Sequence, residues 1–464
     1  MMRSLYSGVS GLQDHQIRMD VLGNNIANVN TTGFKKERVT FQDLLYQQMS
    51  GAAAPDGDLG GVNPKEIGLG VLVGSIDTIH TQGALQTTGV GTDLAIEGNG
   101  FFVLKNGEQT LFTRDGALSP DRDGRLVNGS GYRVQGWLSQ DINGQQVLSP
   151  SGATQDIVIP IGSKDPAKAT DRVDMACNLD KRTSEVPPNA TPDTVEQGTW
   201  RVEEKVYDSF GAPHTLRVEY RKVVGQPNQW QGTVAIDPEA QVPTNTGVAL
   251  GANPAAANGN TFTVEFDNRG LLARVRDGQG NASAQAGALD LGVSFDVAGT
   301  TPAAGGGNTR QTFRINLGTV GSATNTVTQM AERSSTKVFQ QNGYTMGYLN
   351  GFKVDQSGVI TADYSNGTKR TIGQVALGSF TNPGGLEKVG GTNFAQSNNS
   401  GQANIGPSGI AGKGSIIAGS LEMSNVDLAE QMTDMIVTER GFQANSRTIQ
   451  TSDQMLQELL TLKR

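Results

Sequence analysis

Both ends of the chain carry apolar residues at seven-residue intervals. In the first segment they are Leu5, Leu12, Met19 and Ile26, and in the last segment they are Leu428, Met435, Phe442, Ile449 and Leu456. Polar residues flank both stripes, which is typical of the narrow seam of a coiled coil. The pattern predicts one helical domain built from residues 1–30 and 415–464, with Ser424 and Asn425 as helix caps. An ordinary pair of helices inside a globular protein would show the same pattern.

Between these ends the apolar pattern changes to that of β-strands. Residues 72–150 and 325–405 contain short apolar groups separated by Gly, Asn and Asp, which predicts an inner β-domain. Residues 151–324 alternate with period two in segments such as LRVEYRKV, which predicts an outer domain of half-buried antiparallel strands. Residues 31–71 with 406–414 form a predicted connecting segment. The predicted fold class is mainly β with paired α-helical termini and two stacked β-domains.

Glycine and the long connections support this β-rich interpretation. The 61 glycines of the 464 residues separate short apolar stretches and follow no G-X-Y period, which favours many β-turns over collagen. Two connections of the outer domain, near residues 241–260 and 297–311, are rich in Ala, Gly, Thr, Asn and Pro. We expect them to be external loops.

The charge of the chain excludes several classes of partner. It has 37 Lys and Arg against 45 Asp and Glu, a formal net charge of −8. Such a chain lacks the basic field that attracts nucleic acid, so we expect no nucleic-acid partner. No run approaches the ~18 apolar residues that cross a bilayer, so no membrane insertion is expected. The first residues lack the apolar core of a secretory signal, and any export is expected to use another route.

The chain contains no convincing site for turnover chemistry, metal or cofactor. The stretch SPDRDGRLV, with Asp121, Asp123 and Gly124, resembles the start of a calcium loop but lacks the later ligands, which favours a hairpin turn. In GPSGIAGKGS, Pro407 and Gly414 replace required residues of a phosphate-binding loop. The three histidines, His15, His80 and His214, are scattered and fit no catalytic motif, so we expect surface or packing roles. The single cysteine, Cys177, excludes a disulfide within the chain.

Two distant motifs resemble those of the bacterial flagellar rod and hook family. LGNNIANVNTTGFKK, at 22–36, is similar to the N-terminal signature, and the segment from GSLEMSNVDLAEQ to the end is similar to the C-terminal signature. Segments 92–104 and 112–137 resemble the β-domain that follows the first signature. The motif residues singled out are Gly23, Asn24, Asn28, Gly33 and Phe34.

The resemblance implies a structural protein rather than an enzyme. Within the family, a large second β-domain is typical of hook proteins, whereas the distal rod protein is shorter, so a hook protein is expected and the rod protein is the alternative. The family implies a homo-polymer whose terminal helices line a tube that acts as a universal joint for the motor. It also implies contact with the distal rod protein, the hook cap, the hook-filament junction proteins and the flagellar export apparatus. A secreted β-rich adhesin or enzyme with helical ends is a rival from another class.

The lone cysteine resembles that of spirochaete hook proteins in particular. In that subgroup such a Cys loses sulfide to become dehydroalanine, and a Lys of a neighbouring subunit adds to it to give a lysinoalanine cross-link. The resemblance assigns Cys177 to this role, with Asn178 assisting. Lys164 is the expected acceptor, and Lys168 and Lys181 are alternatives. The resemblance implies a periplasmic hook if the source is a spirochaete and an extracellular hook otherwise.

Overall fold

The computed structural model describes most of the chain. The described residues are 2–52, 54–55, 60–142, 145–150, 152–187, 189–239, 246–250, 259–278, 282–283, 288–297 and 310–462. The two long predicted loops therefore lie largely outside the described residues. One part of the first, Thr246–Leu250, forms strand β20 instead, because Val248 is buried and the segment pairs with a neighbouring strand.

The chain folds into two compact units. The first unit comprises residues 1–161, 350–363 and 369–464, and the second comprises residues 162–349 and 364–368. The second unit thus extends beyond the predicted outer domain at 151–324. It includes β26 (Thr328–Met330) and β27 (Ser335–Gln341) because both strands pair with β16 (Arg172–Asp180). The sequence analysis assigned residues 325–405 to the inner β-domain, whereas the structure places these two strands in the second unit.

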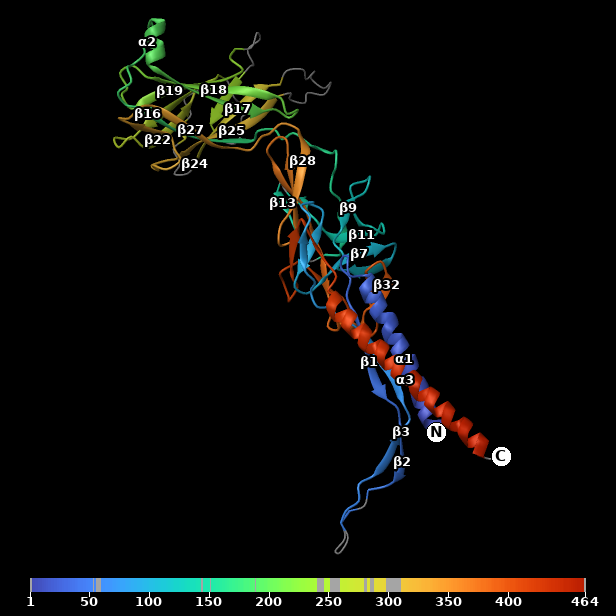
Figure 1. Cartoon of the computed structure of the whole chain (residues 1–464). Helices are drawn as coiled ribbons and strands as arrows, with labels where there is room; N and C mark the ends of the chain where they lie inside the picture. The colour runs from blue at the N-terminus through green and yellow to red at the C-terminus, as the bar shows by residue number, and fades with distance from the viewer. Residues whose placement is uncertain are drawn as a thin grey trace. The chain divides into compact units, whose positions relative to one another are not determined.

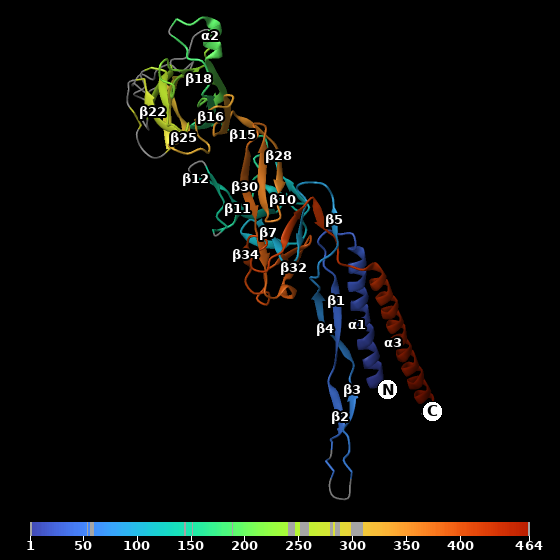
Figure 2. The same cartoon turned by 90° about the vertical axis from the view of Figure 1, so that its left-hand side faces the viewer.

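In the first unit the two terminal helices lie side by side, and their free ends point the same way (Figure 1 and Figure 2). Helix α1 spans Met2–Ala27 and helix α3 spans Leu428–Leu462, which confirms paired helical termini. Helix α3 begins at Leu428, a few residues after the predicted caps Ser424 and Asn425. Its first amides at Ala429 and Glu430 are capped by the Asp427 carboxylate, not by the predicted caps.

Residues 37–78 form two pairs of antiparallel strands, and the first pair packs against α1; the segment thus runs past the predicted connecting segment, which ends at residue 71. Strands β1 (Glu37–Asp43) and β4 (Val71–Thr78) pair antiparallel and pack against α1. Strands β2 (Tyr46–Ser50) and β3 (Lys65–Gly68) continue the ladder beyond them (Figure 2). These outer strands expose large apolar side chains: Tyr46, Met49 and Ile67.

The inner β-domain of the first unit has an aromatic core. Its sheet is centred on β30, β11, β7, β8 and β33, and Phe101, Phe112, Phe380 and Phe394 pack edge to face within it. The strands are β5 Leu85–Thr87, β6 Leu94–Glu97, β7 Phe101–Asn106, β8 Gln109–Thr113, β9 Leu118–Pro120, β10 Leu126–Asn128, β11 Arg133–Leu138, β12 Gln140–Ile142, β13 Gln145–Val147, β14 Gln155–Asp156, β30 Lys369–Val375, β31 Leu377–Ser379, β32 Glu387–Gly390, β33 Asn393–Ala395, β34 Asn404–Gly406, β35 Ser415–Ala418 and β36 Ser420–Glu422. Strands β28 Gly347–Val354 and β29 Val359–Tyr364 include residues of both units.

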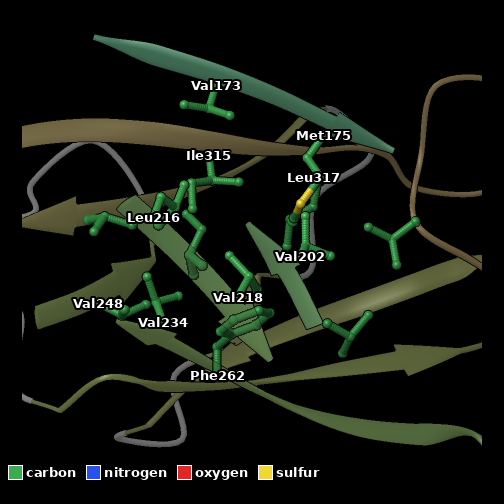
Figure 3. Packing of buried hydrophobic residues seen from close by; sticks show 14 of the residues in the cluster. Val173, Met175, Val202, Leu216, Val218, Val234, Val248, Phe262, Ile315 and Leu317 are labelled. Atoms are coloured by element: carbon green, nitrogen blue, oxygen red, sulfur yellow. The ribbon is translucent and has the colours of Figure 1, made fainter. Parts of the chain in front are cut away.

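The second unit is a sandwich of two sheets around one apolar core (Figure 3). One sheet has the order β20-β24-β25-β16-β26, with β27 also on β16, and the other has the order β17-β18-β19-β21-β22-β23. The predicted alternation is confirmed in β18 and β21, where every second residue is buried. The remaining elements are β15 Lys164–Asp165, α2 Pro192–Gln197, β17 Thr199–Tyr207, β18 Pro213–Lys222, β19 Gln229–Ile236, β21 Thr261–Phe266, β22 Leu272–Asp277, β23 Ala282–Ser283, β24 Ala288–Asp296 and β25 Arg310–Thr319.

A buried ion cluster in the first unit joins Glu422, near the start of the last helix, to segments that follow the first helix. Glu422 accepts hydrogen bonds from Lys35 Nζ at 2.6 Å, from the Gly83 amide at 2.9 Å and from Arg114 Nη1 at 3.1 Å. The side chains of Lys35 and Glu422 are fully buried, and that of Arg114 is 4% exposed. Because a lone buried charge is costly, each member depends on the others.

Burial and neighbouring cations keep a nearby histidine, His80, in its neutral form. Burial and the adjacent cations Lys35, Arg114 and Lys388 lower the pKa of His80 to about 4. His80 is therefore neutral near pH 7 and packs its ring against Phe101 and Phe394. This confirms the packing role expected for it.

Replacing Glu422 by Gln tests the cluster. The substitution leaves Lys35 and Arg114 buried without a countercharge, and we expect it to destabilise the first unit by about 3–5 kcal/mol. Peptide-resolved hydrogen exchange in urea reports the stability of each unit separately. The control is Glu430→Gln, which breaks the Lys36 pair at a side chain that is 54% exposed and should cost about 0–1 kcal/mol. Equal effects of the two substitutions would contradict the assignment.

Candidate assembly surfaces and cross-linking residues

The two terminal helices contact each other through small residues. A Cβ added at Gly11 would lie 2.5 Å from Asn445 Nδ2, and one added at Gly8 would lie 3.0 Å from Thr448 Oγ1. Gly441 of α3 makes an equally close approach to the ring of His15. Glycine at these positions lets the helices approach closely, and bulky side chains would separate them.

Polar pairs extend this contact in both directions. Asn25, which is fully buried, donates from Nδ2 to Gln431 Oε1 at 2.9 Å and exchanges hydrogen bonds with the backbone of Glu37. Arg18 pairs with Asp434 at 3.4 Å. The contacting positions recur at spacings of three, four or seven residues, as in a coiled coil: Ser4, Gly8, Gly11, His15, Arg18 and Asn25 on α1, and Gln431, Asp434, Gly441, Asn445, Thr448 and Ser452 on α3.

The predicted apolar seam lies beside this contact rather than along it. On α1 the apolar heptad Leu5, Leu12, Met19 and Ile26 falls one residue after the contacting positions Ser4, Gly11, Arg18 and Asn25. These four residues are half-buried, as are Met435, Phe442, Ile449 and Leu456, whereas Leu428 is 46% exposed. Ile449 also touches Gly8. The heptad pattern therefore located both helices, and its Ile449 takes part in their contact beside the small and polar positions.

Helix α3 presents further apolar side chains to solvent. Leu428, Met432 and Ile436 follow one another at four-residue spacing, and Met432 and Ile436 are 47% and 58% exposed. Val437 and, near the C-terminus, Leu460 are also exposed. A helix with apolar residues on its solvent side is typical of an interface with another molecule.

The residues of the predicted family motif line a small cavity in the first unit. The cavity has a volume of about 240 Å³ and lies between the end of α1 and the β32–β33 hairpin; Asn24, Asn28, Gly33 and Phe34 line it. Lys388 lies over the ring of Phe34, 5.4 Å from its centre. Gly33 has a φ of +66°, and a Cβ there would lie 2.6 Å from the amide nitrogen of Asp115. The remaining motif residue, Gly23, faces open space.

Cys177 lies in the core of the second unit. It belongs to β16, where Met175, Cys177 and Leu179 point into the sandwich, and it is 4% exposed. Burial raises the pKa of the thiol to about 12, against a smaller opposing effect of the Tyr220 hydroxyl. The thiol is therefore protonated near pH 7, and little of the nucleophilic thiolate is present.

Asn178, the next residue, forms hydrogen bonds to the turn between β26 and β27. Its Oδ1 accepts from the Met330 amide at 2.9 Å, and its Nδ2 donates to the carbonyls of Glu332 and Arg333. These bonds fix the β26–β27 turn beside Cys177. Any role of Asn178 in chemistry must be compatible with these contacts.

None of the three candidate lysines belongs to β16, the strand that carries the thiol. Lys164 is exposed on β15, which pairs with β28 in another sheet, and its Nζ lies 5.6 Å from the centre of the Tyr348 ring. Lys168 is half-buried and bridges to Tyr344, whereas Lys181 is exposed directly after β16. The chain does not place Cys177 and Lys164 in one sheet, so the structure leaves the choice of acceptor open.

The other candidate sites agree with the absence of a catalytic motif. Asp121 Oδ1 accepts from the amides of Asp123 and Arg125 in the turn between β9 and β10, as expected for a hairpin. Within the described residues there is no group of three or more His, Cys, Asp and Glu that would hold a metal ion. In the same residues, no helix has the length and apolar character needed to cross a membrane.

Comparison with known proteins identifies the family. Over its full length the chain is 58% identical to the flagellar hook protein FlgE of Treponema pallidum, and 50% identical to that of Borreliella burgdorferi, with each relative covered completely. The chain belongs to the flagellar hook protein family. Both relatives come from spirochaetes, which confirms the resemblance to that subgroup. Hook proteins are structural proteins rather than enzymes, as the absence of a catalytic motif led us to expect.

Models of hook and rod protein families match most of this chain. The models described as "Flagella basal body rod protein" and "Flagellar basal body rod FlgEFG protein C-terminal" match residues 5–35 and 417–462. Those described as "Flagellar hook protein FlgE/F/G D1 domain" and "Flagellar basal body protein FlaE D2 domain" match residues 95–170 and 178–344. The solved hook protein FlgE2 of Helicobacter pylori shares the fold, with a TM-score of 0.50 and 14% identity over 73% of this chain and 100% of that one.

Several important residues of this hook chain were not predicted from its sequence. Asn25 and Lys35 lie inside the family motif but were not singled out, and both are buried. Glu422 lies inside the C-terminal signature and was not singled out either. The only signal for the helix contact was the set of small residues one position before the apolar heptad, Gly11 among them.

A substitution at Gly11 tests the small-residue contact. Gly11→Leu should force α1 and α3 apart, because even a Cβ would overlap Asn445. The control is Gly23→Leu in the same helix, where a Cβ meets nothing within 4 Å. Both changes raise helix propensity by about 1 kcal/mol, so only the contact differs. In the isolated subunit, amide exchange in residues 2–27 and 428–462 should accelerate for Gly11→Leu only; slow exchange in both variants would contradict the packing.

Proposed function

We propose that this chain is the structural subunit of the flagellar hook and that it polymerises with copies of itself into a tube. The observation that carries this proposal is the family membership, with full-length identity to two hook proteins. The match of residues 178–344 to a D2-domain model supports a hook protein over the distal rod alternative. A rod protein of Bacillus subtilis is 27% identical, well below the two spirochaete hook proteins.

The unpartnered apolar surface of α3 supports polymerisation. The contact between α1 and α3 uses small and polar groups, which leaves Leu428, Met432 and Ile436 exposed. Burying these side chains against a neighbouring subunit would remove apolar area from water, at about 25 cal/mol for each Å². A head-to-tail interface of this kind does not close on itself and builds a helical polymer.

The proposed tube transmits motor torque to the filament as a universal joint. Contacts among terminal helices would resist torsion, while separate β-units outside them would permit bending. The proposed partners are the distal rod protein, the hook cap, the hook-filament junction proteins and the flagellar export apparatus. A spirochaete source would place the hook in the periplasm.

A substitution at Ile436 tests the polymer interface. Ile436→Asp should leave the subunit folded, because the side chain is 58% exposed, but should prevent tubes because a carboxylate would be buried without a partner. The matched control is Ile436→Leu, which keeps the apolar surface and should assemble. Electron microscopy of the purified subunits under assembly conditions is the measurement. Tubes of normal length from Ile436→Asp would count against the interface.

We further propose that neighbouring subunits are joined by lysinoalanine between Cys177 and Lys164. A base removes the Cα proton of Cys177, the Cβ–Sγ bond breaks and sulfide leaves, which gives dehydroalanine. The neutral Lys164 amine of a neighbouring subunit then adds to Cβ, and Cα regains a proton. The exposed position of Lys164 is compatible with this role, and its choice over the equally exposed Lys181 rests on the resemblance to the spirochaete proteins. The buried thiol requires that the strand region around Cys177 opens before the amine reaches it.

The cross-link predicts a reductant-resistant ladder. Tubes boiled in detergent with reductant should run as high-mass species, and Cys177→Ala tubes should form normally but run as monomer. Lys164→Arg should also run as monomer, because a guanidinium keeps the charge over Tyr348 but is a poor nucleophile. The control is Lys168→Arg, which should retain the ladder. A ladder lost on reduction would indicate a disulfide instead.

A further inference from the structure

The buried ion cluster of the first unit holds more positive than negative charge. Its two cations, Lys35 and Arg114, pair with the single carboxylate of Glu422. The side chains of Lys35 and Glu422 are fully buried and that of Arg114 is 4% exposed, so solvent hardly reaches them. One positive charge is therefore left unmatched. Because a buried charge without a counterion is costly, an anion next to this cluster would be stabilising.

A cavity of about 370 Å³ lies beside the cluster. Arg114, His80 and Phe101 line it. The guanidinium carbon of Arg114 lies 5.4 Å from the centre of the Phe101 ring, and the His80 ring lies 5.6 Å from the same centre. Thr381 and Gly412 also line the cavity and are exposed, so it opens to solvent. An ion from solution, or a side chain of another molecule, can therefore enter it.

Two buried nitrogen atoms of the cavity lining have no hydrogen-bond partner among the described residues. Arg114 donates from Nη1 to Glu422 and from Nη2 to the Gly98 carbonyl at 2.7 Å, but its Nε is unpaired there. His80 Nδ1 is unpaired in the same part of the chain. An N–H donor without an acceptor, next to an unmatched positive charge, indicates a ligand that accepts hydrogen bonds and is negatively charged.

We propose that this cavity binds a small oxyanion, a carboxylate or a phosphate group, next to the guanidinium of Arg114. The oxyanion gives the Nε–H group an acceptor and supplies the negative charge that the cluster lacks. The surroundings fit an anion rather than a cation, because burial and the cations Lys35, Arg114 and Lys388 lower the pKa of His80. A bound anion opposes the effect of these cations and raises the pKa of His80. A proton on Nδ1 then makes His80 a second donor to the anion.

The oxyanion has two possible sources. One is free phosphate. The other is an Asp or Glu side chain of a neighbouring copy of this chain, and this source rests on the polymer proposed above. The chain has 45 Asp and Glu residues, so its surface offers many carboxylates. Both sources present the same chemistry to Arg114, and the experiment has an arm for each.

Titration of the isolated full-length subunit with inorganic phosphate tests the site without requiring assembly. Phosphate is added at constant ionic strength, held with sodium chloride, and the ring signals of the histidines are followed by NMR. We expect a saturable change of the His80 signals and a higher pKa of His80, with binding about tenfold tighter when His80 is protonated. The internal control is His15 on α1, which does not line the cavity and should show no such change.

A carboxylate built into the cavity tests the site by substitution. Thr381→Glu places an acid at the exposed rim, and Thr381→Gln is the matched neutral control. We expect the Glu variant to unfold at a higher temperature than the Gln variant and to bind phosphate about tenfold more weakly, because its own carboxylate competes for Arg114. Equal unfolding midpoints and equal responses of His80 in the two variants would overturn the anion site.

Assembly distinguishes the two sources. If a carboxylate of a neighbouring copy fills the cavity, Thr381→Glu subunits should form about tenfold fewer tubes than Thr381→Gln subunits, and His80 in parent tubes should not respond to phosphate. If the two variants assemble equally and His80 in parent tubes still responds, the ligand is a free anion. A parent chain that binds phosphate but forms no tubes would contradict the proposed polymer and leave the anion site intact.

Discussion

The Glu422 carboxylate connects three segments that lie far apart in the sequence. It binds Lys35, which follows the first helix, Arg114 of the inner β-domain and the Gly83 amide, and it stands only a few residues before the last helix. The segment before the last helix is therefore bound to the segments after the first helix by buried charges that are out of contact with solvent. Because both helices emerge from this point, their pairing depends on it.

The small-residue contact between the helices follows from the same geometry. Glycines at positions 8, 11 and 441 let the helices approach closely, so the pair is held by packing and polar contacts rather than by a wide apolar seam. This arrangement divides the helix surface into two parts. The polar side serves the pairing within one chain, and the apolar side, with Met432 and Ile436, is left for a neighbouring molecule.

The sequence was sufficient to predict which segments form helices and strands, but not which other segments they pack or pair with. Seven-residue spacing identified both helices, and period-two alternation identified β18 and β21, because both patterns follow from local backbone geometry. The same spacing suggested an apolar seam, because a heptad does not say which of two adjacent stripes faces the partner. The sheet that β27 joins and the burial of Lys35 depend on contacts between distant segments, which leave no periodic signal. Cys177 was singled out by its uniqueness and family context.

The position of Cys177 restricts the chemistry that is open to it. Oxidation to a disulfide and alkylation both use the thiolate, and a pKa of about 12 leaves little of that form near neutral pH. A buried thiol in this state is therefore protected from general oxidants. Elimination differs, because the SH group leaves as sulfide and no free thiolate has to form beforehand. The same burial that disfavours the common reactions of cysteine is thus compatible with this one, provided that Cα becomes accessible to a base.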